Sequence, residues 1–139
     1  MRIVRAKHQS EVFYGILEGE KVARLTGTPY AGIVRDGREY AFADVCLLAP
    51  AEPTKIVCVG KNYKAHADEM KEGQPEEPLL FLKPNTCVVG NGDAVVYPAL
   101  SKRVDYEAEL GVVIGRAAHA VEPGHAAEYI FGYTCLNDV

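Results

Sequence analysis

The stretch VDYEAELGVVIG, residues 104–115, is the longest β-like run in the chain. Its acidic residues Asp105, Glu107 and Glu109 recur at every second position, and the apolar run LGVVI follows Glu109 directly. Because successive side chains of a strand point to opposite faces, the three acids share one face. The apolar run is more typical of a buried strand than of a fully exposed edge. The pattern therefore predicts a strand with a row of carboxylates that leads directly into a buried sheet.

Composition excludes several classes of protein. The chain has 139 residues, 48% of them apolar, which is enough for about one domain with a core. A formal net charge of −4 and the absence of a Lys/Arg-rich run argue against nucleic-acid or anionic-membrane binding. No apolar run approaches the roughly 20 residues that span a bilayer, and no signal peptide is visible after MRIVRAKHQSE. We therefore expect a cytoplasmic protein without nucleic-acid or membrane partners.

The cysteine spacing and the lack of phosphate-binding motifs give no support for a zinc or nucleotide cofactor. None of the four cysteines forms a CxxC pair, so we expect reduced, buried thiols rather than zinc ligands or disulfides. Neither GxxxxGK nor GxGxxG occurs, so the sequence does not support a nucleotide site. His119 and His125 lie in a loop-like segment and are interpreted as surface residues.

The chain divides into two parts by pattern. Residues 1–54 hold short β-like runs separated by turn residues, among them the Asp36-Gly37 pair, and are expected to form a small N-terminal β domain. Residues 55–139 begin with the strand-like runs KIVCVG and LLFLK, and we also expect a strand over residues 93–98. Between the first two runs the sequence predicts a short helix over residues 65–71, and HAAEYIFGY is interpreted as a helix or a helix–strand junction.

The acidic row has two possible interpretations. Glu107 and Glu109 can converge on a point above the strand, and two carboxylates suit a hard cation such as Mg²⁺, Mn²⁺ or Ca²⁺. Alternatively, the row is a solvated strand face without a metal. A third acid, Asp138, follows the apolar segment YIFGYTCLN, where an unpaired carboxylate would be costly unless a cation offset its charge.

A second candidate constellation is the pair His66 and Glu69. On the expected short helix these residues are at positions i and i+3 and share one face. The glutamate can orient the imidazole and raise its basicity, which suits a general base. An exposed His–Glu pair without a catalytic role is the alternative interpretation.

Four segments carry a resemblance to a known family. In this order, KIVCVGKNYKAHADEM, EEPLLFLKP, RVDYEAELGVVIG and GYTCLNDV resemble the fumarylacetoacetate hydrolase family, from about residue 55 to the last residue. Residues 1–54 resemble the small N-terminal domain of its bacterial 2-hydroxyhepta-2,4-diene-1,7-dioate isomerase-like members. The resemblance implies a β-rich α+β fold, a mixed β-roll with a small N-terminal β domain, in homodimers or larger homo-oligomers. The family's sequence continues beyond the equivalent of Val139, so we expect an active complete protein and an inactive chain of residues 1–139.

The resemblance also implies a site and a reaction. The family's metal ligands match Glu107, Glu109 and Asp138, and its His–Glu pair, on a helix that can close over the site, matches His66 and Glu69. The implied metal is Mg²⁺ or Mn²⁺, and the implied substrates are 2-oxo or enolisable dicarboxylates and acylpyruvates, as in aromatic compound catabolism. The implied reaction is C–C hydrolysis, isomerisation or decarboxylation through a stabilised enolate. Two alternatives stay open: a non-catalytic metal-binding scaffold, and an oligomerisation module without a metal.

Overall fold

The computed structural model describes residues 1–63 and 75–139, and this part of the chain is rich in β-structure. Its helices are short 3₁₀ turns, and every strand pair in it is antiparallel. The strands are β1 (Ile3–His8), β2 (Glu11–Glu18), β3 (Lys21–Leu25), β4 (Arg35–Ala41), β5 (Cys46–Leu47), β6 (Ile56–Gly60), β7 (Leu79–Lys83), β8 (Ala108–Ile114) and β9 (Ile130–Asn137). The 3₁₀ helices are η1 (Pro29–Ala31), η2 (Phe42–Asp44), η3 (Asn85–Cys87) and η4 (Pro123–Tyr129). The expected β-rich fold is confirmed.

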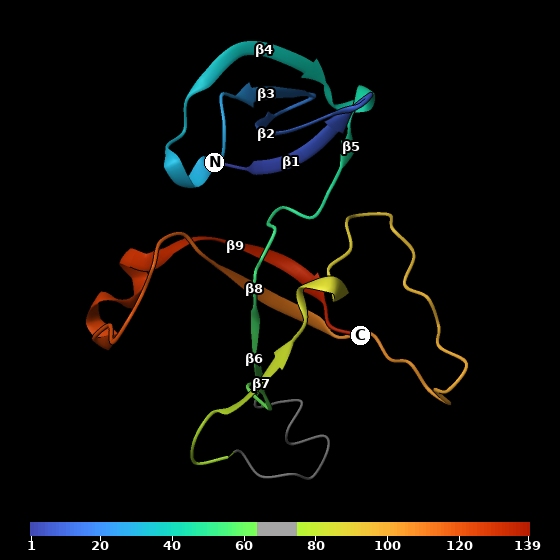
Figure 1. Ribbon diagram of the computed structural model, residues 1–139, viewed down its shortest axis with the longest axis vertical. Coiled ribbons are helices and arrows are strands. Elements are labelled where there is room, and N and C mark those ends of the chain that lie inside the picture. Colours follow the sequence, from blue (N-terminus) through green and yellow to red (C-terminus); the bar gives the residue numbers. More distant parts are fainter. Residues whose placement is uncertain (64–74) are drawn as a thin grey trace. The chain divides into compact units, whose positions relative to one another are not determined.

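The N-terminal strands form one five-stranded sheet in the order β4-β3-β2-β1-β5 (Figure 1). Strands β2 and β3 form a hairpin, with Glu18 opposite Lys21. Gly19 lies in its turn with φ of +58°, a conformation that glycine adopts without steric cost. The short turn fixes the register, because a two-residue connection leaves the strands no room to slide.

A small hydrophobic core lies within this sheet. Val4 and Ala6 alternate along β1, as the period of two requires, and Phe13 on β2 and Val22 on β3 complete the cluster. Ala6 and Val22 are fully buried, with an exposed fraction of 0%. All of the buried apolar residues found within residues 1–63 and 75–139 belong to this N-terminal sheet.

A bulge distorts the pairing of β3 with β4. Ala23 lies opposite Glu39 and Leu25 opposite Arg35, so Asp36-Gly37 falls inside β4 rather than in a turn between strands. Gly37 takes a φ of +88°, which explains why glycine occupies the irregular position. The prediction of a turn at this pair is therefore wrong: Asp36-Gly37 forms a bulge within β4 instead.

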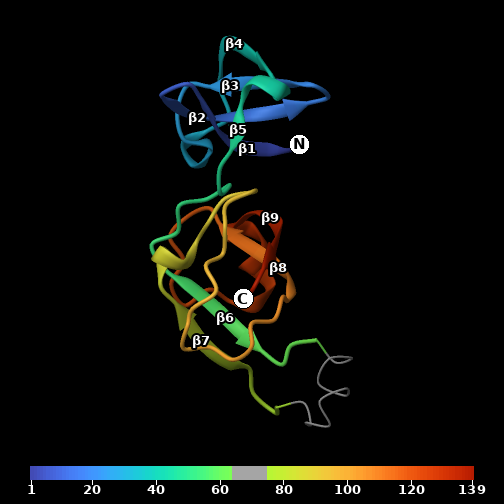
Figure 2. The same ribbon diagram turned by 90° about the vertical axis from the view of Figure 1, so that its right-hand side faces the viewer.

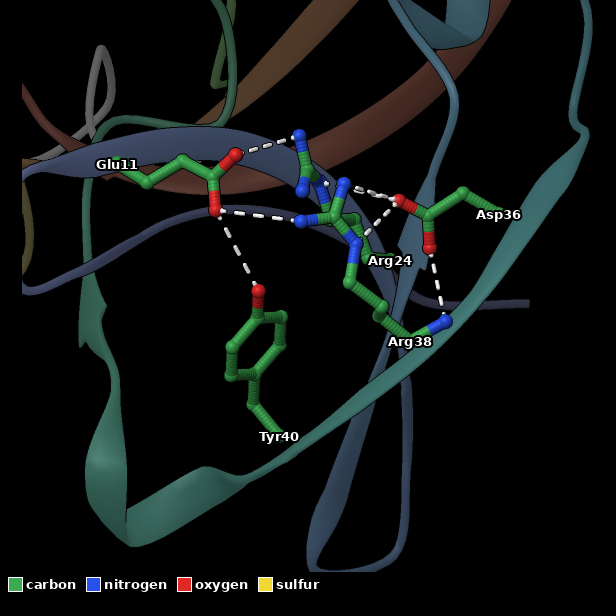
Figure 3. Close-up of polar contacts among 5 residues, drawn as sticks. All are labelled: Glu11, Arg24, Asp36, Arg38 and Tyr40. Atoms are coloured by element: carbon green, nitrogen blue, oxygen red, sulfur yellow. Dashed lines mark hydrogen bonds and ion pairs between the residues drawn. The ribbon is translucent and has the colours of Figure 1, made fainter.

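A polar network lies across the bulge (Figure 3). Arg24 is 16% exposed and contacts Glu11 through Nη2 at 2.7 Å and Asp36 through Nε at 3.4 Å. The backbone N–H of Arg38 donates to Asp36 Oδ1 at 2.8 Å, and its Nε donates to Oδ2 at 3.0 Å. This backbone hydrogen bond is the main cause that lowers the pKa of Asp36 below its usual value. The Tyr40 hydroxyl donates to Glu11 at 3.4 Å.

The remaining strands form two separate ribbons, β6–β7 and β8–β9 (Figures 1 and 2). The contacts divide the chain into two compact units, one of residues 1–51 and 89–139 and one of residues 52–88, which contains β6–β7. Large apolar side chains are exposed on both ribbons, among them Leu80, Leu82, Leu110 and Tyr133. A two-stranded ribbon is at best marginally stable alone, so these faces need a covering surface.

Several expectations for residues 55–139 can be compared with the structure. Strands β6 and β7 lie where KIVCVG and LLFLK predict them, and η4 runs directly into β9 as a helix–strand junction. Residues 93–98 form no strand, which corrects that expectation: the segment has apolar residues, but no strand among residues 1–63 and 75–139 pairs with it. The four cysteines are free, but the expected burial is wrong, because Cys46, Cys87 and Cys135 are exposed and Cys58 is half-buried. Within residues 1–63 and 75–139, no helix has the length and apolar character needed to cross a membrane.

Replacing Gly15 by alanine should destabilise the N-terminal sheet. A Cβ at this position would lie 2.5 Å from Cγ1 of the buried Val22, so the core would have to shift. Overpacking of this kind costs about 1–3 kcal/mol. Denaturant unfolding measures the effect. The matched control is Gly27→Ala, where a Cβ has nothing within 4 Å, and equal stabilities of the two variants would contradict the prediction.

Asp36→Asn should lower stability at neutral pH and have little effect in strong acid. Because the folded pKa of Asp36 lies below its usual value of 3.8, its ionised form stabilises the fold above that pH, and this contribution is lost as the pH falls through the folded pKa. Urea unfolding of wild type and variant at pH 7 and below pH 3 measures the difference. The control is Asp44→Asn, an exposed carboxylate of the same sheet domain. A difference that is equally large at both pH values would rule the linkage out.

Candidate functional site

The pairing of β8 with β9 brings the two ends of the predicted ligand set together. Ala108 lies opposite Asn137, and Glu109 lies opposite Leu136. One residue beyond the ladder, the N–H of Asp138 donates to the carbonyl of Glu107 at 2.9 Å. Glu107 and Asp138 are therefore cross-strand neighbours although they are far apart in sequence.

The three predicted carboxylates share one face of this ribbon by backbone position. Glu107 and Glu109 are two residues apart at the β8 end of the ribbon. Asp138, which follows β9, lies on the same face, because directly opposite residues point the same way. Neighbours at these positions have Cα atoms about 5.5–7 Å apart, within the reach of carboxylate side chains. Glu109 and Asp138 are half-buried, and Glu107 is exposed.

A glycine follows the acids on the same face. A Cβ at Gly111 would lie 2.9 Å from Cγ2 of Thr134 and 3.0 Å from Cδ2 of Leu136. Gly111 therefore leaves room for these two β9 side chains to pack across the strand, with Leu136 opposite Glu109.

Asp105, the first acid of the sequence pattern, has a different environment. Nε of Arg103 contacts its carboxylate at 2.8 Å, and both side chains are largely exposed. The arginine neutralises Asp105 locally, so this carboxylate is less available to a cation than its spacing suggests. The structure thus distinguishes Asp105 from Glu107 and Glu109, which the alternation alone did not.

A pocket of about 230 Å³ lies beside the paired ends of the ribbon. Its walls include Asp105 and Tyr106, just before Glu107, and Asn137 and Val139, on either side of Asp138. The other lining residues are Val95, Tyr97 and Val104. The pocket is thus mainly apolar, and none of Glu107, Glu109 and Asp138 is among its lining residues.

Glu107, Glu109 and Asp138 are the residue types that bind hard divalent cations, although their side chains are not gathered into a cluster. Within residues 1–63 and 75–139, no three His, Cys, Asp or Glu side chains lie close enough together to form a ready metal site. The backbone nevertheless gives Glu107, Glu109 and Asp138 a common face, and three carboxylates supply the oxygen ligands that Mg²⁺ or Mn²⁺ prefers. Convergence requires rotation of side chains, not a change of register.

His66 and Glu69 lie outside the described residues. Within the described ranges, another His–Glu pair with the same i, i+3 spacing occurs on η4, where Nδ1 of His125 lies 2.7 Å from Oε1 of Glu128. Arg116 also contacts Glu128, at 3.3 Å, and all three side chains are exposed. The interpretation of His125 as a surface histidine is consistent with this exposure. The pair is a useful control for the candidate His66.

Asn137 is the residue to which sequence reasoning gave no role. Its Oδ1 accepts a hydrogen bond from the backbone N–H of Glu107 at 2.9 Å. The available signal was an asparagine at the end of a strand, directly before a candidate ligand, since asparagine is depleted in strands and its side chain readily bonds to the backbone.

Two family models match the chain, and together they span most of it. Residues 55–139 match the model described as fumarylacetoacetate (FAA) hydrolase C-terminal. Residues 1–50 match the model described as Rv2993c-like, N-terminal. The chain belongs to the fumarylacetoacetate hydrolase family, as the sequence resemblance predicted.

Curated relatives agree with this membership. Protein Rv2993c of Mycobacterium tuberculosis is 39% identical over 146 residues, which cover 100% of this chain and 55% of the relative. Oxaloacetate tautomerase YisK of Bacillus subtilis is 41% identical over 105 residues, 72% of this chain and 35% of the relative. The mitochondrial oxaloacetate tautomerase FAHD1 of Bos taurus is 45% identical over 83 residues, 59% of this chain and 38% of the relative.

Solved structures share the fold. A 5-carboxymethyl-2-hydroxymuconate delta-isomerase from Mycobacterium smegmatis matches with a TM-score of 0.89 and 38% identity, over 99% of this chain and 54% of that one. A 2-hydroxyhepta-2,4-diene-1,7-dioate isomerase from Mycobacterium marinum matches with a TM-score of 0.87 and 36% identity, over 99% of this chain and 54% of that one. A maleylpyruvate hydrolase from Sphingobium sp. SYK-6, solved with manganese(II) and pyruvate, matches with a TM-score of 0.74 and 26% identity, over 99% and 58%. The chain therefore spans about half the length of these relatives.

Proposed function

We propose that the protein carrying this sequence is a divalent-metal-dependent enzyme that moves a proton in a 2-oxo or enolisable dicarboxylate or acylpyruvate. The observation that carries the proposal is the shared face of Glu107, Glu109 and Asp138. Isomerisation or tautomerisation is the simplest outcome of such a proton transfer. Hydrolysis of a C–C bond and decarboxylation are the other outcomes that the same site chemistry allows.

The names of the relatives support this substrate class. Two are oxaloacetate tautomerases, and two solved structures are isomerases of hydroxymuconate-type and hydroxyheptadienedioate compounds. These reactions have in common the movement of a proton next to a 2-oxo or 2-hydroxy acid group. The maleylpyruvate hydrolase structure, with manganese and pyruvate, supports Mg²⁺ or Mn²⁺ as the metal. Ca²⁺ has the same preference for oxygen ligands.

In the proposed mechanism, Glu107, Glu109 and Asp138 hold the cation. When bound, the cation polarises the 2-oxo acid group of the substrate and stabilises negative charge that develops there. The proposed general base is His66, for which the sequence predicts Glu69 as the orienting partner. It would accept a proton from the carbon next to the carbonyl and return one to the enolised substrate. The proton lost from carbon and the proton gained balance, so an isomerisation needs no further reactant.

Charge in the site restricts how an anionic substrate can bind. Three ionised carboxylates bring a charge of about −3 against +2 from the cation, so a dicarboxylate requires additional cations or hydrogen-bond donors. Further groups would come from the half of the family fold that lies outside this chain.

The assembly and location are also proposals. The exposed apolar residues of β6–β7 and β8–β9 support burial against more of the family fold or against a second copy, in a homodimer or larger homo-oligomer. A cytoplasmic location remains our prediction from sequence, and the bovine relative carries a mitochondrial name.

Removing any of the three candidate ligands should abolish tight metal binding. Because changes to residues that merely support a metal ligand cost about 10–100-fold in affinity, we expect Glu107→Gln, Glu109→Gln and Asp138→Asn to raise the Kd for Mn²⁺ by about 100-fold or more. Isothermal titration of the full-length protein measures the Kd.

Asp105→Asn is the matched control, because its carboxylate contacts Arg103 and should not ligate the cation. We expect this variant to bind Mn²⁺ like wild type. A wild-type protein that shows neither heat nor a stability change with Mg²⁺ or Mn²⁺ would contradict the metal site and would favour an oligomerisation module.

Replacing His66 by alanine should remove turnover and leave metal binding intact. General-base catalysis contributes about 10²–10⁴-fold, so kcat should fall by about that factor. The assay is a panel of oxaloacetate, acylpyruvates and hydroxymuconate-type dicarboxylates with the full-length protein and Mg²⁺ or Mn²⁺. Proton exchange at the carbon next to the carbonyl, followed by NMR, reports the proposed step directly.

The control is His125→Ala, which breaks the exposed His–Glu pair on η4. It should keep the activity of wild type. No turnover of any substrate by a metal-loaded wild type would instead support the alternative of a non-catalytic metal-binding scaffold.

A further inference from the structure

The side chain of Asn137 closes the β8–β9 ladder at the end that carries the acidic residues. Its Oδ1 accepts the N–H of Glu107 at 2.9 Å. The carbonyl of the same Glu107 accepts the N–H of Asp138, also at 2.9 Å. Both backbone polar groups of Glu107 are therefore bonded to two consecutive residues at the end of β9.

This arrangement differs from a regular antiparallel pair. Residues opposite each other in a hydrogen-bonded pair exchange two backbone bonds, one in each direction. At Glu107 and Asp138, one bond runs in this way, and a side-chain amide oxygen accepts in the other direction. Asn137 thus extends the pairing by one position past Ala108, the last residue of the ladder on β8.

The extra position matters because ribbon ends fray. Pairing at the end of a two-stranded ribbon opens with little cost in free energy, and Glu107 is exposed. Glu109 lies inside the ladder, opposite Leu136, and is held by the strand itself. Glu107 lies outside it, so its backbone position depends on these two terminal hydrogen bonds.

We propose that Asn137 is a positioning residue that fixes the backbone of Glu107 in register with Asp138 and so preorganises the two outer carboxylates of the metal site. The inference rests on the proposed metal function. Asn137 acts through Glu107 and needs no contact with the cation or the substrate. Its loss leaves all three carboxylates in the chain but raises the cost of ordering one of them when a cation binds.

The first test removes the acceptor and compares metal affinity. We expect Asn137→Leu, a variant of similar size, and Asn137→Ala, which adds no bulk, to raise the Kd for Mn²⁺ in the full-length protein by about tenfold. Asn137→Asp retains an oxygen in the same position and should bind Mn²⁺ no more weakly than wild type. Asn91→Leu, at an exposed turn position outside the strands, is the control for the substitution itself.

The second readout needs no metal. Amide hydrogen exchange, followed by NMR in the metal-free protein, should be about tenfold faster at Glu107 in Asn137→Leu and Asn137→Ala, and restored in Asn137→Asp. Amides in the interior of β8, such as that of Gly111, should exchange as in wild type. A general loss of stability would instead accelerate exchange along the whole strand.

The outcomes separate this inference from the proposed function. If wild type binds Mn²⁺ and either folded acceptor-free variant binds it equally well, the positioning role is overturned and the metal site stands. If wild type binds no divalent cation, the metal function and this inference both fail. Weaker binding together with local loss of protection at Glu107, and rescue of both by aspartate, supports the positioning role.

Discussion

The antiparallel pairing of β8 with β9 is the interaction on which the candidate site depends. Its register sets Ala108 against Asn137 and continues, through the Asp138 N–H, to the carbonyl of Glu107. The shared face of Glu107, Glu109 and Asp138 follows from this alignment, because directly opposite residues project to the same face. A slip of one position would send one strand's carboxylates to the other face. The hydrogen-bonded backbone, rather than any contact between side chains, therefore defines the site.

The N-terminal sheet and the two ribbons are stabilised in different ways. The N-terminal sheet has its own buried core around Phe13 and Val22, and a polar network around the half-buried Arg24. The described ribbons of residues 55–139 have regular pairing but leave large apolar side chains exposed. Hydrogen bonds within a ribbon specify its register, whereas burial supplies most of the free energy of folding. The chain spans about half the length of the relatives it matches. Exposed apolar side chains on the ribbons are consistent with burial against the other half of the family fold.

Sequence reasoning succeeded where a pattern has one structural solution. The alternation of Glu107 and Glu109 before an apolar run predicted the strand β8, and the order of motifs predicted the family. It failed where the outcome depends on a partner. Asp36-Gly37 forms a bulge because β3 continues to pair on either side of it. Residues 93–98 form no strand, since no strand in the described part of the chain pairs with them. The role of Asn137 also depends on register, which no single segment of the sequence contains. The assignment of His66 and Glu69 remains a prediction.

The ladder also contains an irregularity at its other end. Val113 pairs with Gly132 and Ile114 with Ile130, so Phe131 is an extra residue on β9. This bulge lies between the acidic end and the connection over residues 115–129, and from Val113 to Ala108 the ladder is regular as it approaches the carboxylates. Homologous chains can therefore gain or lose residues in the connection without altering which acids meet. A single-residue insertion or deletion between the bulge and the acids would instead separate them, so length variation in evolution should be confined to the far side of Phe131.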